Sequence, residues 1–230
     1  MNQQTGQGVV LARTDYGEAD RIVTFLTPGN GKVRVVAKGV RKPKSKLAGG
    51  IELFSVSSIT YIKGRRDLDT LISSRLEKHF ANIVKDIERT MFGYEILKVL
   101  NKLVEDEGGE GYYDLLVESM TALDNLQWPK ELAESWFYLQ LMRLLGHLPE
   151  FTKDNSGVNL PQGQNFEFNF DEMVFHPKKD GHFSQNHLKL LKLLSYNSPR
   201  DLVKVQGLDE YLQQLTPLVK QMARQYLIQF

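Results

Sequence analysis

The chain contains 230 residues, of which 41% are hydrophobic and 25% charged, and its formal net charge is +1. This composition is typical of a protein with one or two folded domains. The polar first residues, the lack of any apolar stretch near the roughly 18 residues of a membrane span, and the lack of cysteine lead us to expect a cytoplasmic protein with no secretory signal, membrane segment, disulfide or thiolate metal site.

Five short strands are predicted in the first 80 residues, where apolar side chains recur with a period of two. The predicted strands span residues 9–13, 21–27, 32–38, 55–62 and 68–76. The sequence Pro28-Gly29-Asn30-Gly31 contains residues that accept positive φ, and it predicts a hairpin between the second and third strands. Five strands in this length fit an OB-type β-barrel, and an SH3-like barrel would give a similar pattern.

The apolar period changes to 3.6 after Lys78, which predicts helices in the rest of the chain. The side chains expected to line one side of the first long helix are Phe80, Ile83, Val84, Ile87 and Met91, after which the apolar pattern drifts through Leu97, Leu100 and Val104. A glycine cluster ends this helix, and a second apolar stripe begins at Tyr112. Pro129 precedes a third helix in which apolar residues occupy every face from Leu132 to Leu145, a pattern typical of a helix buried within a bundle.

An irregular insertion is expected at about 147–183. Its one predicted hairpin consists of residues 166–170 and 174–175. Beyond it, Ser184 and Ser198 have the form of helix N-caps, and the second is followed by proline. A last helix begins near Leu208, and Pro217 is expected to kink or split it.

The predicted fold is α+β and multidomain, with a five-stranded OB-type β-barrel at residues 1–80 followed by an all-helical domain at residues 81–230. The two parts differ in charge. Residues 1–80 contain 14 Lys and Arg against 7 Asp and Glu, a net charge of +7, whereas the remainder contains 15 against 21, a net charge of −6. Such a division favours a polyanionic partner for the barrel.

Basic side chains are concentrated in one part of the predicted barrel, where no acidic residue occurs between Asp20 and Glu52. With the next hairpin, this part supplies the candidate DNA-binding residues Arg21, Lys32, Arg34, Lys38, Arg41, Lys42, Lys44, Lys46, Lys63, Arg65 and Arg66. Strand side chains alternate between faces, so Lys32 and Arg34 are expected outside and the intervening valines in the core. Such a face binds phosphates without sequence preference. The alternative is a solvated surface that protects a sheet edge.

Aromatic side chains that stack on bases would strengthen a nucleic-acid surface. The candidates in the barrel are Tyr16, Phe25, Phe54 and Tyr61. Because aromatic side chains within strands usually pack the core, only Tyr16, in a predicted turn, is expected to be exposed.

Several segments resemble the RecO family of bacterial proteins. They are Gly8-Val9-Val10-Leu11, the stretch YGEADRIV from Tyr16, Gly31-Lys32, the stretch VAKGVRKPKSK from Val36, Tyr94-Glu95 and the stretch LGHLPE from Leu145. The resemblance implies a non-enzymatic recombination mediator in DNA repair that binds single- and double-stranded DNA and anneals complementary strands. It also implies that, with RecR, the protein helps load RecA onto DNA covered by single-stranded DNA-binding protein, and that it is nucleoid-associated.

The resemblance further implies that the helical domain receives the acidic, Phe-ending tail of single-stranded DNA-binding protein. Lys98, Lys102 and Arg143 are the candidate cations for that tail. Many members carry a four-cysteine zinc site after the Leu-Gly-x-x-Pro motif, where this chain has no cysteine. We therefore expect no zinc, and the phenylalanines at 166, 168, 170 and 175 are candidates to hold the segment instead.

The alternatives to a DNA-annealing mediator are a metal-dependent nuclease and a non-catalytic structural adaptor with a basic barrel. The side chains that could build a nuclease site are His147, His176, His182, His187, Asp154, Asp171 and Asp180. Their spacing matches no recognised metal motif, so we expect no catalytic metal and no cofactor. Annealing without nucleotide or metal would indicate the mediator, and cleavage in magnesium or manganese the nuclease.

Overall fold

The structure of the protein is a computed structural model that describes residues 3–64, 68–105, 109 and 111–227. The chain forms two compact units, Met1–Asn125 and Leu126–Phe230. Strands give way to helices near residue 80, as the sequence predicts, but the first unit extends to Asn125 because two helices pack with the barrel. None of the helices in the described residues combines the length and the apolar character that crossing a bilayer requires.

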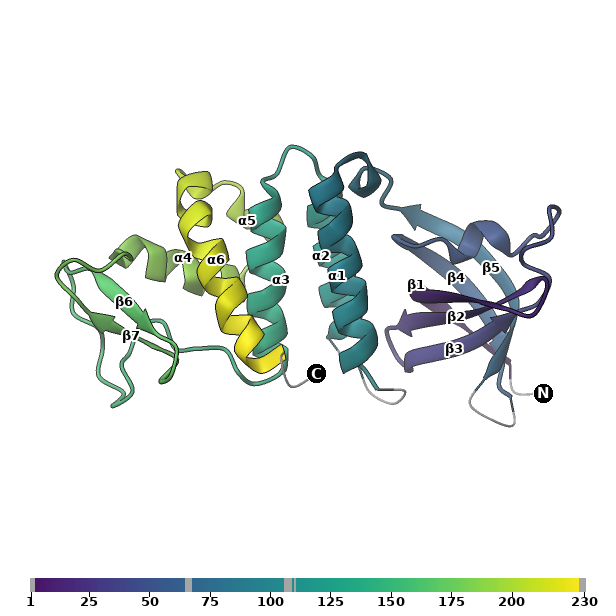
Figure 1. Cartoon of the computed structure of the whole chain (residues 1–230), viewed down its shortest axis with the longest axis horizontal. Coiled ribbons are helices and arrows are strands. Elements are labelled where there is room, and N and C mark those ends of the chain that lie inside the picture. Colours follow the sequence, from purple (N-terminus) through teal and green to yellow (C-terminus); the bar gives the residue numbers. More distant parts are fainter. Residues whose placement is uncertain (1–2, 65–67, 106–108, 110, 228–230) are drawn as a thin grey trace. The chain divides into compact units, whose positions relative to one another are not determined.

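Five strands form the barrel of the first unit (Figure 1). They are β1 (Gln3–Tyr16), β2 (Asp20–Thr27), β3 (Gly31–Ala37), β4 (Ser55–Ile62) and β5 (Asp69–His79). Hydrogen bonds join neighbouring strands in the order β1-β2-β3-β5-β4, and β4 pairs with β1 to close the barrel. β3 and β5 pair in parallel at Val35 and Val36, whereas the other neighbours are antiparallel. The predicted barrel and its β2–β3 hairpin are confirmed, and β1 and β5 are longer than predicted.

Alternate side chains of the strands fill the interior of the barrel. The buried core consists of Val10, Val23, Phe25, Val33, Val35, Ala37, Val40, Ile51, Ile59, Tyr61 and Leu71. Phe25 and Tyr61 belong to this core and Phe54 is also buried, so these three candidates are not available to stack on bases. Tyr16 is 50% exposed and lies at the end of β1.

Two helices, α1 (Ile87–Leu103) and α2 (Tyr112–Asp124), complete the first unit. The first part of the predicted apolar side of α1 is wrong, whereas Leu97, Leu100 and Val104 in its later part are buried. Phe80 and Ile83 are buried before the helix begins, whereas Val84, Ile87 and Met91 are exposed. A short 3-10 helix at Ile83–Lys85 precedes α1. The apolar period of 3.6 residues counted from Phe80 therefore does not continue in register into α1. The side chains that α1 does bury include Phe92, Ile96, Leu97 and Leu100.

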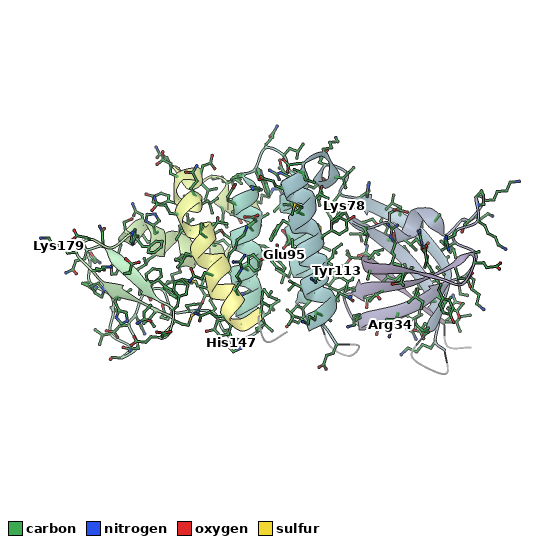
Figure 2. All side chains as sticks on the ribbon, in the orientation of Figure 1. Arg34, Lys78, Glu95, Tyr113, His147 and Lys179 are labelled. Carbon is green, nitrogen blue, oxygen red and sulfur yellow. The ribbon has the colours of Figure 1, made fainter. Side chains whose placement is uncertain are left out.

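Close contacts join these helices to the barrel and to each other. A Cβ added to Gly93 of α1 would lie 2.8 Å from the ring of Phe54, so only glycine permits this approach. The buried guanidinium of Arg89 donates to the carbonyl oxygen of Leu123 at 2.7 Å, near the end of α2, where helix carbonyls lack intrahelical partners. Tyr113 of α2 donates to the side-chain oxygen of Gln7 at 3.3 Å (Figure 2). Both helices are therefore part of the barrel unit.

The second unit is built around one buried helix. Its helices are α3 (Lys130–Leu144), α4 (Gln185–Tyr196), α5 (Pro199–Leu202) and α6 (Leu208–Leu227). Every residue of α3 from Leu132 to Met142 is buried, which confirms the predicted central position. Of the kink or split predicted at Pro217, the split is wrong, since α6 is continuous through this residue, and the kink stays a prediction. Packing holds the helix there, because the neighbouring Thr216 is hydrogen-bonded to Ser135 of α3 at 2.8 Å within the core.

The segment between α3 and α4 is held by aromatic packing. The predicted hairpin is confirmed as β6 (Phe166–Asn169) and β7 (Val174–Pro177). Phe175 is fully buried and makes edge contacts with three other phenylalanine rings. The ring centroids lie 4.9 Å away for Phe168, 5.6 Å for Phe183 and 6.4 Å for Phe151. These contacts supply a small apolar core for a segment with little regular structure.

His187 makes the stability of the second unit depend on pH. Its Nδ1 accepts from the backbone N–H of Ser184, the N-cap of α4, at 3.0 Å, and burial lowers the pKa of the imidazole below its usual 6.5. The unfolded chain therefore binds a proton at a higher pH than the folded chain does. The stability that this group contributes is present above pH 6.5 and is lost as pH falls through the lower folded pKa.

We expect urea unfolding midpoints of the second unit to fall between pH 7.5 and pH 5, and to fall less in His187→Gln. Glutamine can accept the same N–H bond at this capping position without titrating. Equal pH dependence in the two proteins would show that His187 is not responsible.

Candidate nucleic-acid interface

The basic segment after β3 is an ordered turn attached to the β1–β2 connection. The backbone N–H of Gly39, at a φ of 63°, donates to the carboxylate of Asp20 at 2.7 Å. The N–H of Arg41 donates to the carbonyl oxygen of Ala19 at 2.9 Å. Further along, the N–H of Ser45 donates to the carbonyl oxygen of Lys42 at 3.0 Å. The lysines of this segment are therefore presented from a defined backbone.

Four lysines of this segment are exposed, and none of them forms a salt bridge with the part of the chain that the structure describes. They are Lys38, Lys42, Lys44 and Lys46. Arg34 is also exposed on β3 (Figure 2), while its neighbours Val33 and Val35 belong to the buried core. This is the alternation that the sequence predicts.

Lys63 extends the same surface from the β4–β5 connection. It is exposed, and the adjacent Gly64 donates its N–H to the carboxylate of Asp69 at 2.8 Å. Asp69 pairs with Val35 of β3, which brings this connection beside the basic strand. Arg65 and Arg66, two further candidates from the sequence, lie outside the described residues.

Three other candidate cations are engaged within the protein. Lys32 is half-buried, and its Nζ donates to the carbonyl oxygen of Asn101 near the end of α1 at 3.1 Å. Arg21 binds the carboxylate of Asp15 at 2.8 Å, and Arg41 lies 3.6 Å from the same carboxylate. The hydrogen bond from Arg21, with the nearby charge of Arg41, lowers the pKa of Asp15. Sequence reasoning did not identify Asp15, because only the pairing of β1 with β2 shows that it lies opposite Arg21.

The cations predicted to bind a protein tail do not lie in one unit. Lys98 and Lys102 are exposed on α1, in the first unit. Arg143 is exposed on α3, in the second unit, where its Nε donates to the side-chain oxygen of Gln140 at 3.0 Å. Their joint role stays a prediction.

A groove lies in the second unit between α3 and α6, and sequence reasoning did not predict it. It has a volume of about 590 Å³ and is lined by Glu131, Glu134, Gln213, Thr216, Pro217, Lys220, Gln221 and Arg224. Glu134 is buried and lies 2.7 Å from Lys220. No motif could have revealed it, because its two walls are far apart in the sequence.

The histidines considered for a metal site have other partners. His176 lies 2.8 Å from Glu172, and His182 lies 2.8 Å from Glu167. His147 stacks on Tyr226 with ring centroids 4.3 Å apart. Within residues that the structure describes, no three His, Asp or Glu side chains are grouped so as to hold a metal ion. The nuclease alternative gains no support from this geometry.

Comparison with known proteins gives matches over nearly the whole chain. The family described as recombination protein O N terminal matches residues 1–80, and the one described as recombination protein O C terminal matches residues 84–229. Curated proteins named DNA repair protein RecO are similar to the chain. The protein of Desulfatibacillum aliphaticivorans is 35% identical over 148 residues, which is 63% of this chain and 57% of that protein.

A relative from Dehalococcoides mccartyi strain CBDB1 is 26% identical over 227 residues, which is 91% of this chain and 85% of the relative. A relative from Roseiflexus sp. strain RS-1 is 36% identical over 145 residues, or 63% of this chain and 50% of the relative. In several of these matches the chain thus spans little more than half of the relative's length. Because the two family matches follow each other along one chain and together include both units, the chain belongs to the recombination protein O (RecO) family.

Proposed function

We propose that the protein is a non-enzymatic mediator of DNA repair and recombination that binds DNA through the outer surface of its barrel. The observation that carries the proposal is the set of exposed cations on β3 and the turn after it that have no acidic partner among the described residues, namely Arg34, Lys38, Lys42, Lys44 and Lys46. When such cations neutralise DNA phosphates, the counterions bound to the DNA are released. This gives affinity that needs no particular base sequence. The names of the curated relatives agree with this role.

A barrel that binds both single- and double-stranded DNA by phosphate contacts can also bring complementary strands together. We therefore include strand annealing in the proposed function. Loading of RecA together with RecR, and docking of the tail of single-stranded DNA-binding protein, complete the proposal. Exposed Lys98, Lys102 and Arg143 support tail docking by offering charge to its carboxylates.

The test is fluorescence anisotropy of labelled single-stranded DNA over a salt series, together with annealing of complementary oligonucleotides in chelator without nucleotide. We expect binding that weakens steeply with salt, and annealing that needs no metal. Cleavage of DNA in magnesium or manganese would favour a nuclease instead. Lack of DNA binding at low salt would contradict both of these functions and favour a structural adaptor.

Tyr16 is expected to add base stacking to this surface, because it is half exposed at the end of β1. Tyr16→Ala should weaken binding of single-stranded DNA by about 1–3 kcal/mol, the usual value of one stacked base. Tyr16→Phe should retain the affinity, since the ring remains. Duplex DNA should be affected less, because its bases already stack on each other. Tyr196→Ala, at a 64% exposed tyrosine of the second unit, is the control. Equal losses for alanine and phenylalanine at position 16 would exclude stacking.

A further inference from the structure

One carboxylate lies between two arginines at the end of the barrel that carries the basic turn. Asp15 comes from the end of β1, Arg21 from the start of β2, and Arg41 from the turn after β3. Nε of Arg21 donates to Oδ1 of Asp15 at 2.8 Å, and a terminal nitrogen of Arg41 lies 3.6 Å from Oδ2. Each carboxylate oxygen thus faces a different guanidinium.

We infer that Asp15 occupies the position of a DNA phosphate in the free protein, and that a phosphate of single-stranded DNA displaces it on binding. Asp15 then limits how tightly the barrel holds DNA. This inference rests on the function proposed above, and it names the group in that surface which opposes binding.

The geometry supports displacement because a phosphate also offers two oxygens to two guanidinium groups. Arg41 is held independently of Asp15, since it donates to the carbonyl oxygen of Glu18 at 3.3 Å. Arg41 can therefore keep its position when the carboxylate leaves, and Arg21 loses only the partner that the phosphate replaces. Arg13 of β1 is engaged elsewhere, because its guanidinium lies 2.7 Å from the carboxylate of Glu52. The pair that can receive the phosphate is thus Arg21 and Arg41.

The exposure of the three side chains makes the exchange easy. The side chain of Asp15 is 54% exposed, and those of Arg21 and Arg41 are 31% and 38% exposed. Ion pairs at such positions add little stability, and the carboxylate can turn into water without a desolvation cost. Lys42 and Lys44 lie beside Arg41 in the same turn, so an incoming phosphate meets more positive charge than Asp15 alone can offset.

The test compares Asp15→Asn with Glu18→Gln in the full chain. Both variants remove one exposed negative charge, Asp15 from the end of β1 and Glu18 from the turn that follows it, but the Glu18 carboxylate forms no salt bridge among the described residues. We expect Asp15→Asn to bind single-stranded DNA about three- to tenfold more tightly at low salt, because the phosphate then meets both arginines without displacing a carboxylate. Its log-log salt slope should change by no more than roughly 0.7, the value for the single phosphate that the two arginines bind. Glu18→Gln should change affinity less than about twofold, as expected for a screened surface charge. In a background with Arg21→Ala and Arg41→Ala, the gain from Asp15→Asn should disappear.

Each result has one meaning. Equal gains from Asp15→Asn and Glu18→Gln would overturn the inference, because the effect would then belong to the general field of the barrel. Weaker binding by Asp15→Asn would also overturn it, since Asp15 would then orient the arginines for DNA. In both cases the unchanged chain still binds DNA, so the proposed function stands. Failure of the unchanged chain to bind DNA at low salt would contradict both the inference about Asp15 and the proposed function. Thermal unfolding of each variant verifies that the barrel is folded.

Discussion

Simultaneous replacement of Lys42, Lys44 and Lys46 by alanine is expected to weaken single-stranded DNA binding on the order of tenfold to a hundredfold at low salt, and to lower the log-log salt slope by roughly 2. The three side chains are exposed and form no salt bridge within the described residues, so each is free to meet a phosphate. The slope follows from about 0.7 per lost phosphate contact with single strands. Fluorescence anisotropy across a salt series measures both quantities.

The matched control replaces three exposed lysines of the second unit, Lys179, Lys189 and Lys192, by alanine. It removes the same charge from the whole chain, so its effect reports net charge alone. The control should leave the slope nearly unchanged. If both triple variants lose the same slope, the turn after β3 is not the interface, and DNA responds only to the total charge of the protein.

Phe175→Ala is expected to destabilise the second unit by about 3–5 kcal/mol, the usual cost of truncating a buried phenylalanine. The ring is fully buried and contacts Phe151, Phe168 and Phe183. The surrounding segment has only a two-stranded hairpin as regular structure, so little else can compensate for the cavity. Urea unfolding followed by circular dichroism measures the change.

Val158→Ala in the same segment serves as the control, because Val158 is 61% exposed. Its effect should stay within about 0.5 kcal/mol, as for most surface substitutions. A cost below about 1 kcal/mol for Phe175→Ala would show that the aromatic contacts do not hold this segment, since truncations of buried phenylalanine rarely cost so little.

Local patterns in the sequence predicted most of the elements. The period-two runs located the barrel strands, and the apolar residues on every face of α3 predicted its burial. Periodicity failed at the start of α1, because a 3-10 turn at Ile83–Lys85 shifts the register and leaves Ile87 and Met91 exposed. The predicted split at Pro217 failed for a different reason, since packing of α6 against α3 keeps the helix continuous.

The sequence by itself determined that this protein has a basic barrel followed by helices, because strand period, helix period and charge density depend on residues close together in the chain. Only the tertiary structure decided which of the basic side chains have partners within the protein and which are available to bind phosphates. Lys32 is bound by the backbone of Asn101, 69 residues away, and Arg41 lies beside the carboxylate of Asp15 on β1. The extent of the first unit, to Asn125, was likewise set by packing. Such pairings depend on strand register and on helix docking, which bring together residues that no local pattern relates.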